Sequence, residues 1–223
     1  MRDAYERFFE SLKIPPEQFF QFGLSEIVHI PFDAACAEWE QLKLRITNGD
    51  IVFIRGFGRN ALNSHLFVDL YTSLFGHRNI SIDPTNNAAP AKLLQVLTGF
   101  SKTPRKGCER LRNYQVTHVF GRTKNPYAFT APWNIVYLPK IIDPFTGHES
   151  KGDLTLKFQQ MFRQHIFAIF SPMIHDFNQM VSDQQIVSRI DAHLSILDQP
   201  PALVEKFRNS LTEEWRPIAD VVG

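Results

Sequence analysis

Residues 113–152 read NYQVTHVFGRTKNPYAFTAPWNIVYLPKIIDPFTGHESKG, and this stretch carries the clearest structural pattern in the chain. Two runs rich in β-branched and aromatic residues, 114–120 and 135–138, predict strands. The residues between them include one Gly and two Pro, which are typical of turns. After the second run, Thr146 and Glu149 have the spacing of a capping box and predict the start of a helix. The sequence therefore predicts a strand, a loop, a second strand and a helix, in that order.

Three polar side chains occupy the junctions of this pattern. His118 lies near the end of the first predicted strand, Asn134 opens the second, and His148 lies at the start of the predicted helix. A neutral imidazole can take a proton from water near pH 7 when a carbonyl holds its other nitrogen and fixes its tautomer. Phosphodiester hydrolysis needs such a base, together with a means of neutralising charge on the phosphate.

The order of these residues resembles the HNH, or ββα-metal, endonuclease family over about forty of the 223 residues. In that family the first His activates water, the Asn pins the loop between the strands, and the last His binds the metal ion. The resemblance implies that His118 and Asn134 are catalytic and that His148 is a metal ligand. It also implies a metal-dependent enzyme that hydrolyses phosphodiester bonds in DNA, such as a bacterial restriction or phage-defence enzyme.

One position departs from the family pattern. The family commonly has an acid directly before the first His, whereas this chain has Thr117. We expect Asp143, in the loop before the predicted helix, to supply the missing carboxylate as a second metal ligand; the alternative is that Asn134 itself approaches the metal ion, as the Asn does in some other ββα-metal nucleases. Oxygen ligands favour Mg²⁺ or Mn²⁺, and a His ligand also admits Zn²⁺ or Ni²⁺, so Mg²⁺ is the first expectation.

Basic residues cluster beside the motif. Residues 102–124 contain seven Lys and Arg residues and one Glu, a net charge of +6, although the whole chain carries only +1. A run of this kind favours contact with phosphates, and a solvated charged surface is the alternative interpretation. The residues expected to bind nucleic acid are Lys106, Arg110, Arg112, Arg122, Lys124 and Lys151. DNA is the expected partner, with RNA as the alternative.

The composition indicates an ordinary globular protein, because 43% of residues are hydrophobic and 21% are charged. We interpret the 20 Phe residues as aromatic core rather than as base-stacking groups. Cys36 and Cys108 form no CxxC pair, and no apolar run is long enough to cross a bilayer, so a reducing cytoplasmic location is expected.

The chain is expected to be an α+β protein, mainly helical, with a ββα-metal unit flanked by helical segments. A basic segment at 101–107 predicts a boundary between a helix-rich region, 1–100, with a structural or DNA-recognition role, and a nuclease region with C-terminal helices, 101–223. A nuclease that cuts both strands of a duplex would often be a homodimer.

Two alternatives from other functional classes stay open. In the first, the protein keeps the HNH-like fold and binds nucleic acid without cutting it. In the second, it is a helical interaction protein in which His118 is a core residue, Asn134 a turn residue and His148 a solvent-facing residue. Convergence of these side chains on one pocket would favour the nuclease interpretation over the second alternative.

Overall fold

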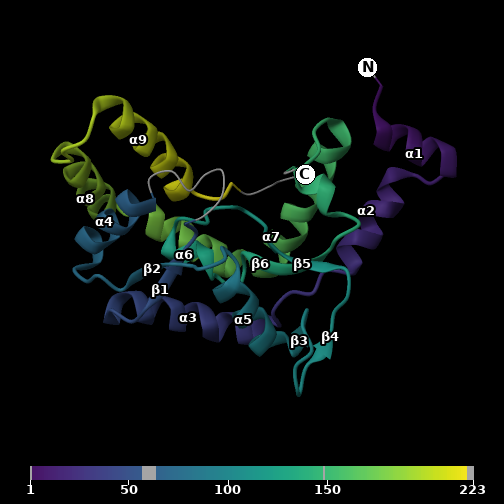
Figure 1. The fold of residues 1–223 in the computed structure, drawn as a ribbon, viewed down its shortest axis with the longest axis horizontal. Coiled ribbons are helices and arrows are strands. Elements are labelled where there is room, and N and C mark those ends of the chain that lie inside the picture. The colour runs from purple at the N-terminus through teal and green to yellow at the C-terminus, as the bar shows by residue number, and fades with distance from the viewer. Residues whose placement is uncertain (1, 57–63, 148, 220–223) are drawn as a thin grey trace.

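The computed structural model describes residues 2–56, 64–147 and 149–219 (Figure 1). The helices of this part of the chain are α1 (Ala4–Leu12), α2 (Pro16–Ser25), α3 (Phe32–Asn48), α4 (Ser64–Phe75), α5 (Ala88–Thr98), α6 (Pro126–Phe129), η1 (a 3₁₀ helix, Asp143–Thr146), α7 (Asp153–Val181), α8 (Gln184–Ser195) and α9 (Pro201–Trp215). Its strands are β1 (Val52–Ile54), β2 (Ile80–Ile82), β3 (Phe100–Ser101), β4 (Glu109–Arg110), β5 (Tyr114–His118) and β6 (Ile135–Pro139).

The strands form two-stranded sheets within the described residues. β1 pairs with β2 and β3 with β4 in parallel, whereas β5 and β6 pair antiparallel, with His118 opposite Ile135. The β5–β6 pair lies in the middle of the molecule (Figure 1). In the same view, α1 and α2 lie at one end, and α4, α8 and α9 lie at the other. The prediction of a mainly helical α+β protein is confirmed.

Local sequence signals account for several elements. Helix α4 has a leucine at every fourth position, and Leu66, Leu70 and Leu74 are all buried, as a stripe on one helix face requires. α5 ends at Gly99, which has a φ of +73°, a conformation that glycine adopts without steric cost. Both predicted strands of the 113–152 stretch form, as β5 and β6.

The predicted helix start at Thr146 is wrong. The Thr146 hydroxyl donates to the Asp143 carbonyl at 2.7 Å, within η1, instead of capping a following helix. Gly147, at a φ of +91°, ends this 3₁₀ turn, and α7 begins only at Asp153, after Gly152. The capping-box spacing of Thr146 and Glu149 therefore lies in the connection between η1 and α7 and not at the start of a helix.

A proline, Pro172, interrupts the regular geometry of the long helix α7. α7 continues from Asp153 to Val181, with a kink marked by non-helical dihedral angles at Phe170. Proline lacks a backbone donor and clashes with the preceding turn, which bends a helix without always ending it.

A single hydrophobic core crosses the predicted boundary at 101–107. Trp39 of α3 packs edge-on against Trp133, with ring centroids 5.8 Å apart. An isolated bridge between Val28 and Tyr137 joins the N-terminal region to β6. Most of the Phe residues are buried in this core, which confirms their interpretation as packing residues.

No helix within residues 2–56, 64–147 or 149–219 combines the length and the apolar character needed to cross a membrane.

Candidate nuclease site

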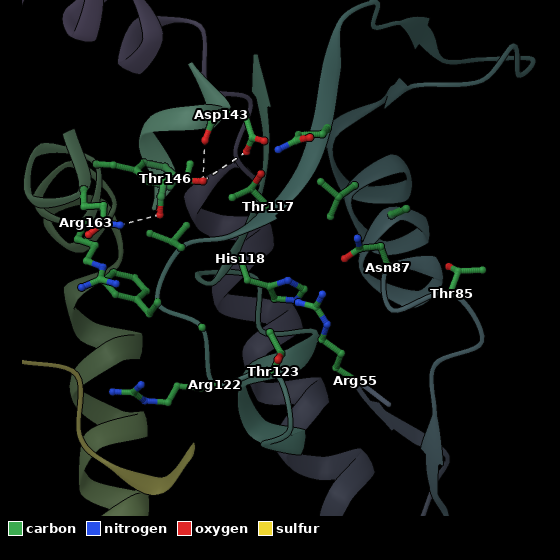
Figure 2. A pocket seen from close by; sticks show the side chains of 18 of the residues that line it. Arg55, Thr85, Asn87, Thr117, His118, Arg122, Thr123, Asp143, Thr146 and Arg163 are labelled. Atoms are coloured by element: carbon green, nitrogen blue, oxygen red, sulfur yellow. Dashed lines mark hydrogen bonds between the residues drawn. The ribbon is translucent and has the colours of Figure 1, made fainter. Parts of the chain in front are cut away.

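A pocket of about 850 Å³ opens beside the C-terminal end of β5 (Figure 2). His118 lies in the middle of the view, with Thr85 and Asn87, which precede α5, on one side and Arg122 and Arg163 on the side of α7. The side chains and backbone that line the pocket belong to Arg55, Thr85, Asn87, Ala88, Ala91, Lys102, Gln115, Val116, Thr117, His118, Val119, Phe120, Gly121, Arg122, Thr123, Asp143, Thr146, Gln159, Phe162, Arg163 and Glu214.

The imidazole of His118 is held by Phe129. Its Nε2 lies 2.9 Å from the Phe129 carbonyl oxygen, and the two rings stack with centroids 5.3 Å apart and planes 16° from parallel. A carbonyl oxygen can only accept, so Nε2 must carry the hydrogen. In the neutral ring, Nδ1 then carries the basic lone pair, which is the arrangement that a general base requires.

Helix α6 brings the Phe129 carbonyl to this position. Asn125 begins the helix, and its Oδ1 accepts from the backbone N–H of Tyr127 at 2.9 Å. The Nδ2 of Asn125 donates to the carbonyl of Glu214 at 3.0 Å, which ties α6 to the end of α9. The short Asn-Pro helix therefore fixes the partner of His118, and the C-terminal helix supports it.

Asn134 is fully buried and connects three parts of the loop between β5 and β6. Its Oδ1 accepts from the backbone N–H of Phe120 at 2.9 Å, and its Nδ2 donates to the carbonyls of Gly121 at 2.8 Å and Ala128 at 2.9 Å. Its backbone carbonyl accepts from Val119 at 2.9 Å. Asn134 thus pins the loop that positions His118 and does not itself line the pocket. A direct catalytic role for Asn134 stays a prediction.

Asp143 and Thr117 are both lining residues of the pocket. Asp143 is the first residue of η1, and its Oδ1 lies 3.4 Å from the Thr146 hydroxyl. Thr117 is only 6% exposed, and its hydroxyl has no hydrogen-bond partner within the described residues. Both oxygens are of the hard type that Mg²⁺ prefers, and Mg²⁺ commonly uses one or two carboxylates plus waters and substrate phosphates. The oxygen atoms here fit that pattern.

His148, the other predicted metal ligand, lies outside the described residues. In the rest of the chain that the structure describes, no three His, Cys, Asp or Glu side chains gather in a way that could hold a metal ion. A cation at Asp143 would therefore draw further ligands from water, from substrate or from His148.

The predicted nucleic-acid residues divide into three groups. Arg122 lines the pocket. Lys124 was predicted to face nucleic acid, but it is buried, with its Nζ 5.1 Å from the centre of the Phe67 ring and its carbonyl accepting from Tyr71 at 2.7 Å. The side chain packs into the interior here, and a role of Lys124 in binding nucleic acid stays a prediction. The remaining four residues are exposed and lie away from the pocket lining: Lys106, Arg110, Arg112 and Lys151.

The structure adds residues that the sequence patterns did not single out as site residues. Arg55 follows β1 and is anchored by its backbone N–H, which donates to the Thr123 carbonyl at 2.8 Å. Arg163 comes from α7 and Glu214 from α9. Lys102, which belongs to the basic segment 102–124, also lines the pocket. No local sequence pattern marked Arg55, Arg163 or Glu214 as neighbours of His118.

Glu214 is the lining residue with the most altered ionisation. Burial raises the pKa of its carboxyl to about 7, although the backbone N–H of Lys124, which donates to Oε2 at 2.9 Å, and the nearby cations Lys124 and Arg122 favour the charged form. The folded protein therefore holds the Glu214 proton more tightly than the unfolded chain does.

Replacing Glu214 with Gln is expected to make the protein more stable above pH 7. The ordinary pKa of 4.5 applies to the unfolded chain, so wild-type stability falls as pH rises from about 4.5 through about 7, whereas the Gln variant escapes this loss. The difference should reach at most about 3 kcal/mol at pH 8 and shrink towards pH 5. Urea denaturation of both proteins at pH 5, 6, 7 and 8 measures it. A gap that stays constant with pH would contradict the assignment.

Comparisons with known proteins place the chain in a family. The family described as "Uncharacterised protein PM1201" matches residues 30–220. The protein of that name from Pasteurella multocida is 40% identical over 223 residues, covering 99% of each chain. No solved structure matches the chain. The chain belongs to the PM1201 family.

Proposed function

We propose that this member of the PM1201 family is a metal-dependent endonuclease that hydrolyses phosphodiester bonds in DNA, with His118 as the general base. The observation that supports this best is the hydrogen bond of His118 Nε2 to the Phe129 carbonyl, beside a pocket that a phosphate can enter. The lining also favours an anion, because four cationic residues, Arg55, Lys102, Arg122 and Arg163, outnumber two acids, Asp143 and Glu214.

The proposed reaction uses a water molecule as the nucleophile. His118 Nδ1 accepts one proton of the water, and the resulting hydroxide forms the new bond to phosphorus. The ester P–O bond breaks, which leaves a phosphate on one fragment and a hydroxyl, protonated from solvent, on the other. Phe129 keeps the imidazole in the required tautomer, and Arg55, which lies with His118 in Figure 2, contributes positive charge where charge develops on the phosphate.

Asp143, with His148, is the proposed holder of a divalent cation, and Mg²⁺ is the first candidate. Such a cation supplies Lewis-acid stabilisation of negative charge on the phosphate oxygens. The buried Thr117 hydroxyl supports the position, because a polar atom without a protein partner is costly unless a ligand satisfies it. Mn²⁺, Zn²⁺ and Ni²⁺ are the other ions to test.

Metal removal is expected to abolish cleavage. Purified protein is incubated with supercoiled plasmid DNA and Mg²⁺, Mn²⁺, Zn²⁺ or Ni²⁺ in separate reactions, and conversion to the nicked form is followed on a gel. At least one metal should support nicking, and excess EDTA should return it to background. Asp143→Asn should require a higher metal concentration for the same rate, because it removes the negative charge of the carboxylate proposed to hold the cation. Nicking that persists in EDTA would contradict the metal-dependent mechanism.

A nucleic-acid-binding protein without catalysis is the second candidate function. It is favoured by Thr117, which stands where the HNH family commonly has an acid, and by the small number of metal-ligand side chains gathered among the described residues. This candidate predicts salt-sensitive DNA binding and no nicking with any of the four metals.

A restriction or phage-defence role, and a homodimeric assembly, belong to the proposal by analogy with the HNH family alone. DNA is the proposed substrate, and an RNA duplex tested in parallel provides the comparison.

A further inference from the structure

Two arginines, Arg122 and Arg163, line the α7 side of the pocket. Arg122 follows Gly121 and has a φ of +57°, a conformation that costs a non-glycine residue roughly 1 kcal/mol or more. Its Nε donates to the Arg216 carbonyl at 3.2 Å, which directs the side chain towards the end of α9. Arg163 projects from α7, and Figure 2 shows its guanidinium group on the same side of the pocket as that of Arg122. The fold therefore gathers these cations at some cost in backbone strain.

These cations have little compensating charge nearby. Within the described residues, no carboxylate oxygen lies within 4.0 Å of the guanidinium nitrogens of Arg122 or Arg163, whereas Arg216 pairs with Glu213 at 3.0 Å. Burial, and then the positive charge of Arg216, lower the pKa of both Arg122 and Arg163. Glu214 and Glu213 both favour the charged form of Arg122, and the Glu214 carboxyl is only partly ionised near pH 7. Arg122 is partly exposed and Arg163 is exposed, so both guanidinium groups are open to an anion that enters the pocket.

We propose that Arg122 and Arg163 form a second phosphate site, which holds a non-scissile phosphate of the DNA strand whose scissile phosphate lies at His118. This assignment rests on the proposed function, because it takes a polynucleotide as the occupant. Guanidinium groups suit this role, since each offers a planar set of donors to phosphate oxygens. The pocket is also continuous from these arginines to His118, so one strand can reach both places.

If this phosphate site exists, the charges of Arg122 and Arg163 contribute to DNA affinity and to its dependence on salt. Each phosphate contact that is lost reduces the slope of log K against log salt by about 1. Arg122→Gln and Arg163→Gln should therefore each reduce the slope by about 1, and the double variant by about 2. Arg163→Lys should keep the wild-type slope while weakening binding, because it retains the charge and loses the bidentate geometry. Arg208→Gln is the matched control, since Arg208 is an exposed arginine of α9 away from the pocket lining.

Binding is measured by fluorescence anisotropy of a labelled 20-base-pair DNA duplex in EDTA, at several NaCl concentrations. Circular dichroism and thermal melting check that each variant is folded. Equal slopes for the wild type, the double variant and Arg208→Gln would overturn the second phosphate site, as would an absence of DNA binding by the wild type. Plasmid nicking by the wild type is scored separately. If the arginine variants reduce the salt slope but the wild type nicks no plasmid, the phosphate site is supported and the nuclease proposal is rejected. If the wild type nicks plasmid but the slopes do not change, the nuclease proposal is supported and the second phosphate site is rejected.

Discussion

The variant His118→Ala is expected to nick plasmid DNA about 10² to 10⁴ times more slowly than the wild type. The reason is that His118 has its Nε2 hydrogen directed to the Phe129 carbonyl, which leaves Nδ1 as the proton acceptor for the attacking water. Initial rates with the best metal, at equal protein concentration, measure the loss. This effect should appear mainly in the rate of the chemical step, because the variant keeps the four cationic lining residues that are proposed to hold the DNA.

Two further variants separate loss of the base from loss of structure. His118→Gln keeps a side chain that can donate to the Phe129 carbonyl but has no group basic enough to activate water, so it should be as slow as the Ala variant. His65→Ala is the control, because His65 is exposed on α4 and lies outside the pocket lining. Wild-type nicking rates in a folded His118→Ala protein would remove His118 from the mechanism.

The variant Asn134→Ala is expected to lower the free energy of unfolding by about 3 to 5 kcal/mol. Its side chain satisfies the N–H of Phe120 and the carbonyls of Gly121 and Ala128; Gly121 is partly buried. Truncation removes the hydrogen-bond partners of the Phe120 N–H and the Gly121 carbonyl, whereas the Ala128 carbonyl still accepts from Ala131 at 3.3 Å, and each buried group left unsatisfied costs about 1 to 3 kcal/mol. Equilibrium unfolding in urea, followed by tryptophan fluorescence, measures the difference.

The matched control for this prediction is Asn209→Ala, at an exposed position of α9, which should change stability by about 0.5 kcal/mol or less. A loss below about 1 kcal/mol for Asn134→Ala would show that the loop between β5 and β6 is held mainly by other contacts. The nicking rate of Asn134→Ala is then compared with that of the wild type at a temperature where the variant remains folded. The ratio shows how strongly the position of His118 depends on this loop.

Local signals predicted many elements well. The repeated leucines of α4 and the β-branched runs of β5 and β6 depend on interactions between near neighbours in sequence, and those interactions survive in the folded chain. The helix start at Thr146 failed because two positive-φ glycines, Gly147 and Gly152, turn the backbone before α7 begins. A capping pattern shows that the side chains suit a helix start, but it does not determine whether the backbone that follows adopts helical dihedral angles.

The sequence by itself determined the order of strand, loop and strand, the placement of His118 and Asn134 at its junctions, and the aromatic character of the core. These features follow from hydrophobic periodicity, from the residue preferences of turns and from the burial of apolar side chains. All three can be read from residues that are near each other in the sequence.

Only the tertiary structure decided which groups share the pocket with His118. The packing of α7 and α9 brings Arg163 and Glu214 to the pocket, and the turn into α6 supplies the Phe129 carbonyl. The same packing buries Lys124, although its neighbours in sequence are basic and polar. The physical reason is that charge and hydrogen-bonding capacity belong to single residues, whereas burial and electrostatic pairing depend on segments that are distant in sequence and meet only when the core forms.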